Sequence, residues 1–221
     1  TNALISGTTA SDNAGDGFAL DRATSGITIN ESVASGNTGS GFVIVGRALA
    51  EGPSAVGVSM RSYGNSSVSN STATGNGNYG IEVVGGLNIS LSNNEITGHD
   101  MGILINGEAE RISVTGNQVH DSERHGIALV DSVISSMVSG NVVDGASTGI
   151  YVRDSSVAVK GNTVQGAGSH GVSFVGQVDG AEVSYNALAG RGGSALDTRR
   201  SNGELTVTNN NKSGETHTST T

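Results

Sequence analysis

A four-residue unit recurs along most of the chain: a glycine, an apolar residue, any residue and a second apolar residue. Its copies begin at Gly17, Gly41, Gly80, Gly102, Gly126, Gly149 and Gly171. Successive copies are 24, 39, 22, 24, 23 and 22 residues apart, so only one interval departs from a regular period. The alternation of apolar residues predicts short strands and excludes helical repeats, whose apolar residues recur at i, i+3 and i+4. Short strands at a fixed period of this size are typical of a solenoid, in which each repeat forms one coil.

A second marker, an apolar residue followed by two small residues and an asparagine, lies between these units. Its asparagines are Asn94, Asn117, Asn141, Asn162, Asn186 and Asn210, and the same position in earlier repeats holds Thr8, Ser32 and Ser71. One coil then contains three strand-like pieces, at Ile112–Thr115, Gln118–Val119 and Gly126–Val130. Stacking such coils predicts three parallel sheets around an apolar interior. The asparagines would form an internal ladder in which each amide bonds to the turn of the next coil.

Composition narrows the class of partner. Glycine supplies 35 of the 221 residues without the three-residue period of collagen, which predicts many tight turns that need a positive φ angle. The net charge of −9 argues against nonspecific binding of nucleic acid, which requires a basic face. No apolar run reaches the ~18 residues of a membrane-spanning helix, and the absence of cysteine excludes disulfides and cysteine nucleophiles. We therefore expect neither a nucleic-acid nor a membrane partner.

The repeat predicts a single β-helical domain over residues 1–208, as part of a longer solenoid, because the first residues already follow the pattern. The one long interval contains the single proline, Pro53, and predicts an inserted loop at about residues 46–63. Long loops in compact repeats are often functional. Residues 209–221 lose the pattern and are rich in Asn, Ser and Thr, which predicts a polar tail or linker.

Two stretches resemble a known family. The segment from Gly41 to Ser54 is similar to a Gly-Leu-Val-Val strand followed by Gln-Arg-Gly and a loop with proline. The segment from Val114 to Asp121 is similar to a coil that ends in Asn-Gln-Ile-His-Asp. Both patterns occur in the catalytic module of bacterial mannuronan (alginate) C5-epimerases, within the pectate-lyase-like group. The resemblance covers roughly residues 10–175 and implies an all-β fold, a right-handed parallel β-helix with coils of 22 to 24 residues.

The resemblance implies a secreted or cell-surface protein of bacteria that acts on or binds an acidic polysaccharide such as alginate. The chain departs from the family's catalytic motif, Asp-Pro-His-Asp, which occurs nowhere in it. Where the family has Arg-His-Gly-Phe, the matching strand reads Gly-Asp-Gly-Phe at Gly15–Phe18, and an Arg-His-Gly-Ile sequence at Arg124–Ile127 lies several coils later. No catalytic residue is therefore assigned. Three functions stay open: a mannuronan C5-epimerase, a polysaccharide lyase, and a noncatalytic stalk, adhesin or phage-type receptor-binding segment.

In this fold the strand that begins with glycine usually lies on the sheet that forms the groove, which makes polar residues on its outward positions candidate sugar contacts. C5-epimerisation and β-elimination share a first step, in which a cationic group neutralises the uronate carboxylate and a base removes the C5 proton. The candidate contacts are Asp16, Arg47, Tyr79, Glu82, Arg124, His125, Tyr151, Arg153 and His170. Each of them could equally be a solvated surface residue. His125 and His170 lie two coils apart, about 10 Å by the coil rise, which is too far for one metal ion and suits successive sugars.

No cofactor is expected from the sequence. Loop carboxylates leave a calcium site as an alternative, because carboxylate and backbone oxygens are the ligands that calcium prefers. These carboxylates are Asp100, Glu108, Glu110, Asp121 and Asp144. The Gly-Gly-x-Gly-x-Asp repeat of calcium-binding β-rolls does not occur, so no such module is predicted. His99 and Asp100 are neighbours in a predicted strand, so their side chains should point to opposite faces.

Overall fold

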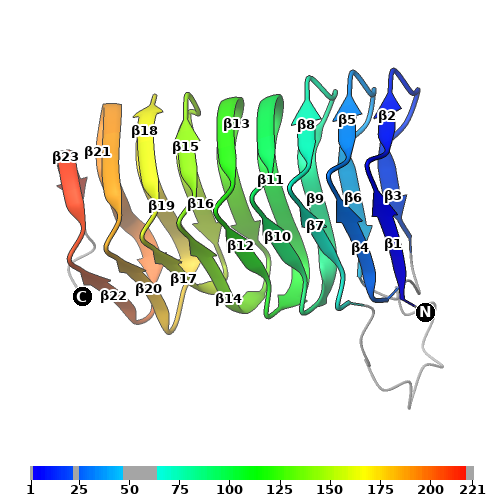
Figure 1. The fold of residues 1–221 in the computed structure, drawn as a ribbon. Coiled ribbons are helices and arrows are strands. Elements are labelled where there is room, and N and C mark those ends of the chain that lie inside the picture. Colours follow the sequence, from blue (N-terminus) through cyan, green and yellow to red (C-terminus); the bar gives the residue numbers. More distant parts are fainter. Residues whose placement is uncertain (1, 22–24, 47–63, 218–221) are drawn as a thin grey trace, which may run out of the picture.

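The chain winds into a parallel β-helix in a computed structural model, which describes residues 2–21, 25–46 and 64–217 (Figure 1). About 8 turns stack along one axis, and the described residues form strands and turns without any helix. The first and last coils lie at opposite ends of the rod. The expected all-β solenoid is confirmed.

The first of three sheets contains the strand that precedes each ladder asparagine. Its register aligns equivalent residues of successive coils, so that Leu91 pairs with Val114 and Val114 with Val138. These side chains are fully buried inside the rod. The strands of the first sheet are β1 (Ala3–Ser6), β4 (Ile27–Asn30), β7 (Ser67–Ser69), β10 (Ser90–Ser92), β12 (Ser113–Thr115), β14 (Val133–Ser139), β17 (Ser156–Lys160), β20 (Ala181–Ser184) and β22 (Leu205–Thr208).

The second sheet begins directly after the ladder asparagines. Ile96, Val119 and Val143 are aligned in three successive coils and face the interior. The strands of the second sheet are β2 (Thr9–Ser11), β5 (Val33–Ser35), β8 (Thr72–Thr74), β15 (Val142–Asp144), β18 (Thr163–Ala167), β23 (Asn211–His217) and the first parts of β11 (Glu95–Glu110), β13 (Gln118–Val130) and β21 (Ala187–Asn202).

The third sheet contains the glycine-led units. Its strands are β3 (Phe18–Leu20), β6 (Phe42–Val45), β9 (Tyr79–Leu87), β16 (Thr148–Arg153), β19 (His170–Gln177) and the later parts of β11, β13 and β21. Gln118–Val119 and Gly126–Val130, which we expected as separate pieces, are the two ends of the single strand β13. They are joined because the pairing of β13 with β11 continues through Ser122, so the strand bends from one sheet into the next.

One continuous apolar core fills the rod. The two inward rows expected for the third sheet are confirmed, since every member is fully buried. The first row is Ile81, Ile103, Ile127, Ile150 and Val172, and the second is Val83, Ile105, Leu129, Val152 and Phe174. Outward positions of the same strands are therefore held at fixed spacings along the rod by the packing beneath them.

The predicted asparagine ladder is present. The backbone N–H and the side-chain Nδ2 of Asn117 both donate to Oδ1 of Asn141, each at 2.9 Å, and the pattern repeats from coil to coil. In the earlier coils hydroxyls continue the ladder: the N–H of Ser71 donates to Asn94, and the N–H of Ser32 donates to the Ser71 hydroxyl. Buried turns thus have their backbone donors satisfied by side chains of the next coil.

A second ladder, which the sequence analysis did not predict, lines the turn between the second and third sheets. Asn13 donates to Asn37, and Asn37 donates to Asn76. In the next coil this position is His99, whose Nδ1 lies 3.2 Å from the Asn76 carbonyl oxygen and whose Nε2 lies 3.1 Å from that of Ala73. Burial lowers the pKa of His99. The neutral ring has a single N–H, so it can donate to only one of the two oxygens.

The glycines of the repeat unit are required by packing rather than by turn geometry. Gly126 does not adopt a positive φ, and a Cβ at this position would lie 2.8 Å from the carbonyl oxygen of Gly149 in the next coil. Gly116, in the turn before a ladder asparagine, does have a positive φ of 67°. The expectation that glycine marks tight turns is therefore right for Gly116 and wrong for Gly126.

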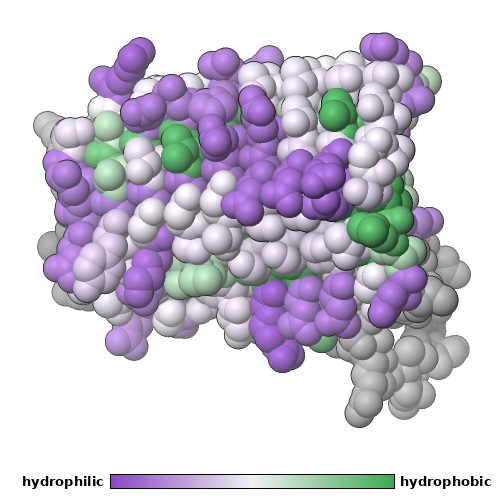
Figure 2. All heavy atoms as spheres, viewed as in Figure 1, coloured by the Kyte–Doolittle hydropathy of each residue, from purple (hydrophilic) through white to green (hydrophobic). Residues whose placement is uncertain are grey.

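Part of the expected layout lies outside the described residues. Arg47 and Pro53 belong to residues 47–63, which fall in the expected insertion and are not described. Beyond Thr208, strand β23 pairs with β21 in parallel. The face of the rod turned to the viewer in Figure 1 is mostly polar, with small separate apolar spots (Figure 2).

Candidate functional site

Two rows of side chains run along the outer face of the third sheet, parallel to the rod axis. The first row aligns Tyr79, Met101, His125, Thr148 and His170. The second row aligns Glu82, Leu104, Ala128, Tyr151, Ser173 and Asp197. Five of the nine predicted sugar contacts stand in these rows.

A side chain of the first row contacts the second-row side chain of the following coil. The rings of His125 and Tyr151 are stacked, and the Nε2 of His170 lies 3.5 Å from a carboxylate oxygen of Asp197. The Ser40 hydroxyl, one coil before Tyr79 in the first row, donates to Glu82 at 3.3 Å. The outer face thus carries three diagonal pairs, each of which joins two successive coils.

The centre of the outer face is a cluster from three successive coils. The guanidinium of Arg124 donates to both carboxylate oxygens of Asp100, with its Nε 2.5 Å from Oδ1. The Tyr79 hydroxyl, two coils away, lies near enough to Arg124 to contribute, after Asp100, to raising the pKa of the guanidinium. The hydrogen bond from Arg124 holds the pKa of Asp100 below its usual value, so this pair is ionised. A cation is therefore fixed beside the Tyr79 hydroxyl.

His125 stands next to this cation as a neutral base. Burial, assisted by the charge of Arg124, lowers the pKa of His125 from 6.5 to about 4. Its Nδ1 is buried and has no hydrogen-bond partner among the described residues. The imidazole is therefore uncharged near neutral pH and has one nitrogen that can accept a proton.

An apolar cluster forms the floor between these polar groups. It consists of side chains on the outside of the rod that are nevertheless buried, with Tyr79 and Tyr151 packed against them. Its members are Met101, Leu104, Ala128 and Val130. Aromatic rings flanking an apolar floor suit the apolar face of a sugar ring, while the tyrosine hydroxyls remain available to its polar edge.

Glu82 lies at the N-terminal end of this cluster. Burial raises the pKa of Glu82, the hydrogen bond from Ser40 opposes this, and the nearby charge of Asp16 adds to it. Asp16 in turn accepts the backbone N–H of Ser40 at 2.8 Å. Asp16 and Glu82, both predicted contacts, therefore share one serine, and Glu82 holds its proton to a higher pH than an ordinary glutamate.

His170 belongs to a separate polar group two coils beyond His125. Besides its contact with His170, Asp197 accepts two hydrogen bonds from Arg199, with Nε at 2.9 Å and Nη2 at 3.1 Å. Arg199, then His170, keep the pKa of Asp197 below its usual value. Asp197 went unnoticed in the sequence because its coil reads Ala-Leu-Asp-Thr at Ala195–Thr198, with alanine in place of the marker glycine.

The remaining candidates do not join the central cluster. Arg153 lies at the end of β16 and donates to both oxygens of Asp131, at 2.8 and 2.9 Å. Arg47 lies outside the described residues. The sequence suggested Asp100 only as a loop carboxylate, but in the structure it orients Arg124. Its outward direction could have been predicted, because its neighbour in the strand, His99, is buried on the opposite face.

The structure gives no support to a calcium site in the part of the chain that it describes. No three side chains among His, Asp and Glu of residues 2–21, 25–46 and 64–217 are grouped so that they could hold a metal ion. The same part of the chain contains no helix that is long and apolar enough to cross a membrane.

A family model described as the right-handed β-helix region matches residues 50–188. The chain belongs to the right-handed β-helix family. This membership confirms the predicted handedness and the predicted fold class. A search of curated protein sequences gave no significant match to this β-helix.

Solved structures share the fold at low sequence identity. The A-module of the Azotobacter vinelandii mannuronan C-5 epimerase AlgE4 gives a TM-score of 0.66 at 18% identity, covering 100% of this chain and 58% of that one. The Streptococcus pneumoniae surface protein and adhesin PfbA gives a TM-score of 0.65 at 14% identity, covering 95% of this chain and 64% of that one. The enzymatically active domain of bacteriophage CBA120 tailspike protein 2 gives a TM-score of 0.57 at 12% identity, covering 88% of this chain and 36% of that one. This β-helix therefore spans 36–64% of the length of these structures, and the likeness concerns the fold.

Proposed function

We propose that the outer face of the third sheet binds an extended acidic polysaccharide and that the cluster around Tyr79 and His125 exchanges the C5 proton of one uronate unit, as a mannuronan C5-epimerase does. The observation that carries this proposal is the row that places Tyr79 and a neutral, buried His125 two coils apart, with the cation Arg124 directly before His125. An acid, a cation and a base are the groups that removal and return of a C5 proton require.

The spacing of the cluster suits one sugar ring. Tyr79 and His125 stand in the same outward row with Met101 between them. Two coils correspond to ~9.6 Å along the rod, which leaves room for one pyranose ring between the two side chains. The ring would stand edge-on over the apolar floor, with Tyr79 as the acid on one of its faces and His125 as the base on the other.

The reaction would proceed through an enediolate. His125 accepts the C5 proton, and the electron pair of the broken C–H bond moves into the carboxylate group. Arg124 stabilises the added charge. Tyr79 then gives its hydroxyl proton to the opposite face of C5, which inverts that centre, and solvent restores both side chains.

A noncatalytic polysaccharide-binding role is the second candidate. It is favoured by the double hydrogen bond of Arg124 to Asp100, which already neutralises the cation that a uronate would need. Among proteins of the same fold, PfbA is a surface protein and adhesin. We infer a secreted or cell-surface location for either role.

Incubation with polymannuronate separates the candidates. Inversion at C5, followed by proton NMR, supports the epimerase, and new unsaturated ends, followed by ultraviolet absorbance, indicate a lyase. Saturable binding without reaction supports the noncatalytic role. Absence of both reaction and binding contradicts the proposal. Tyr79→Phe and His125→Gln should each abolish inversion while leaving polymer binding within about threefold of wild type.

A further inference from the structure

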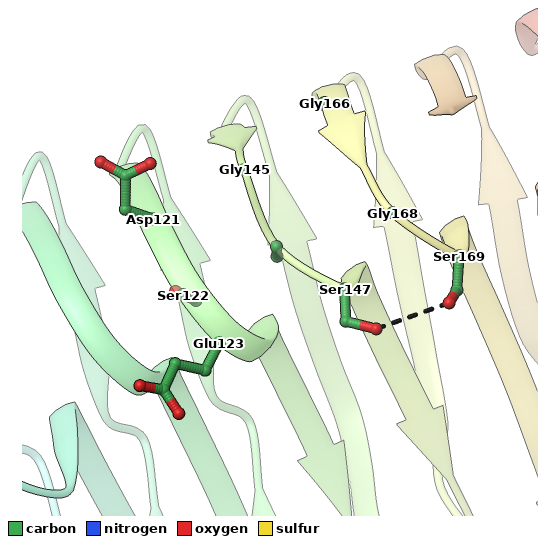
Figure 3. Close-up of a pocket in the computed structure, with 9 residues that line it drawn as sticks. Asp121, Ser122, Glu123, Gly145, Ser147, Gly166, Gly168 and Ser169 are labelled. Carbon is green, nitrogen blue, oxygen red and sulfur yellow. Dashed lines mark hydrogen bonds between the residues drawn. The ribbon is translucent and has the colours of Figure 1, made fainter. Parts of the chain in front are cut away.

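A shallow hollow lies on the outside of the rod where three consecutive coils turn from the second sheet to the third (Figure 3). Its floor has no large side chain and consists of Gly145, Ala146, Gly166 and Gly168. Asp121 and Glu123 stand at one end, and Ser147 and Ser169 lie along the edge. The hollow is next to the first outward row but contains none of the residues of the central cluster.

We propose that this hollow binds a neutral sugar unit of a glycan that lies along the rod axis. The lining offers carboxylates and hydroxyls, which accept and exchange hydrogen bonds with sugar hydroxyls. None of the lining residues is a lysine or an arginine. The neighbouring cation, Arg124, is held by Asp100. Asp121 and Glu123 would therefore repel an anionic sugar and bind a neutral one.

The hydroxyls along the hollow repeat with the coils. The Oγ atoms of Ser147 and Ser169, in successive coils, are 3.5 Å apart. Coils follow one another at ~4.8 Å, a step close to the length of one pyranose unit in an extended chain. A glycan along the rod can therefore meet one hydroxyl for each sugar, and the glycine floor lets the ring approach the backbone closely.

Two other kinds of ligand fit less well. The carboxylates of the hollow are not part of any metal-holding group in the described residues. A peptide would need free strand-edge groups or an apolar anchor site. The N–H groups of Gly168 and Ser169 already donate to the carbonyl oxygens of Ala146 and Ser147, and no large apolar side chain lines the hollow.

Gly168 offers a direct way to fill the hollow. It does not adopt a positive φ, and a Cβ there would meet only Ser147 at 3.8 Å and Ala146 at 3.9 Å, which are ordinary contacts. Gly168→Leu should therefore fold and occupy the floor. Gly15→Leu is the matched control, because a Cβ at Gly15 meets nothing within 4 Å and this residue lies in the first coil. Glu123→Gln removes one carboxylate and keeps its shape.

Titrations followed by two-dimensional NMR of the backbone amides of the full chain test the proposal. The ligands are neutral oligosaccharides of mannan, galactan and xylan, a mannuronate oligosaccharide, and calcium chloride alone. We expect at least one neutral oligosaccharide to bind, and we expect Gly168→Leu to weaken it at least about tenfold. Glu123→Gln should also weaken binding of the neutral oligosaccharide, whereas Gly15→Leu and His125→Ala should leave this binding unchanged. Insensitivity to His125→Ala separates this site from the proposed function.

Three results would overturn the proposal. The first is no binding by any neutral oligosaccharide of the panel. The second is binding that neither Gly168→Leu nor Glu123→Gln weakens. The third is a saturable shift of the Ser147 and Ser169 amide signals by calcium or mannuronate alone, which would assign the hollow to a charged ligand.

Discussion

The imidazole of His125 lies face to face with the phenol ring of Tyr151, with ring centroids 4.4 Å apart and an angle of 4° between the ring planes. Tyr151 belongs to the next coil, so the stack bridges two coils of the third sheet. Burial of the imidazole, which this stack contributes to, is the main cause of the lowered pKa of His125. The same contact thus fixes both the orientation and the charge of the ring.

We expect Tyr151→Ala to raise the pKa of His125 from about 4 towards its usual value of 6.5, because the substitution exposes the imidazole to water. Arg124→Gln should raise it as well, by removing a nearby positive charge. Two-dimensional NMR of the imidazole signals measures both. A value at or above 6.5 in the wild type would show that the ring is not buried as described.

The same shift makes the free energy of unfolding depend on pH. The pKa of His125 is lower in the folded chain than its usual value of 6.5, so the unfolded chain binds the proton more tightly. The contribution of neutral His125 to the free energy of unfolding is fully present above pH 6.5 and is lost as the pH falls towards 4. Urea unfolding at pH 7 and pH 5 should therefore show a larger loss for the wild type than for His125→Gln.

The bidentate geometry of Arg124 gives a third prediction, which rests on the proposed epimerase activity. Arg124→Lys keeps the charge but cannot donate to both carboxylate oxygens of Asp100 in the planar arrangement that a guanidinium allows. We expect it to lower kcat/KM on polymannuronate at least about tenfold. Arg153→Lys is the control, since Arg153 also donates to both carboxylate oxygens of an aspartate, Asp131, although through Nη2 alone and away from the cluster. Equal losses of kcat/KM in the two variants would show that these ion pairs affect the reaction only by stabilising the fold.

The sequence could place the outward rows but not the contacts across them. Tyr79, His125 and Tyr151 were found because they hold fixed positions relative to the marker glycine, which the coil period makes equivalent in space. Asp100 was missed because its role depends on Arg124, one coil away, about which a spacing rule carries no information. Asp197 was missed because alanine replaces the marker glycine in its coil. The charge of His125 depends on burial by a neighbouring coil, and this too appears only in three dimensions.

The marker glycines lead to a fourth prediction. Gly126→Ala should destabilise the chain by ~1–3 kcal/mol, because its Cβ would be forced against the carbonyl oxygen of Gly149 in the next coil. Gly168→Ala is the control and should change the free energy of unfolding by less than ~0.5 kcal/mol, since its Cβ meets only ordinary contacts. Denaturant unfolding measures both. A neutral effect of Gly126→Ala would mean that adjacent coils can separate slightly without loss.

The fold was largely predictable because one packing rule is repeated in every coil. A glycine that admits the next coil, two inward apolar residues and a turn asparagine reappear in most coils, so a pattern found once is confirmed several times. The second ladder escaped notice because it is short. It holds Asn13, Asn37 and Asn76 and then changes residue type at His99, so no repeated letter marks it.

The ladders supply the last prediction. Asn141→Ala should cost ~2–4 kcal/mol, because it leaves the two donors of Asn117 without their acceptor inside the rod. Asn78→Ala, at an exposed turn, is the control and should cost less than ~0.5 kcal/mol. His99→Asn should be close to neutral, since an asparagine there can continue the ladder from Asn76, whereas His99→Ala should be destabilising. Denaturant unfolding at pH 7 measures all four variants, and a cost for His99→Asn as large as that for His99→Ala would contradict the ladder role of this position.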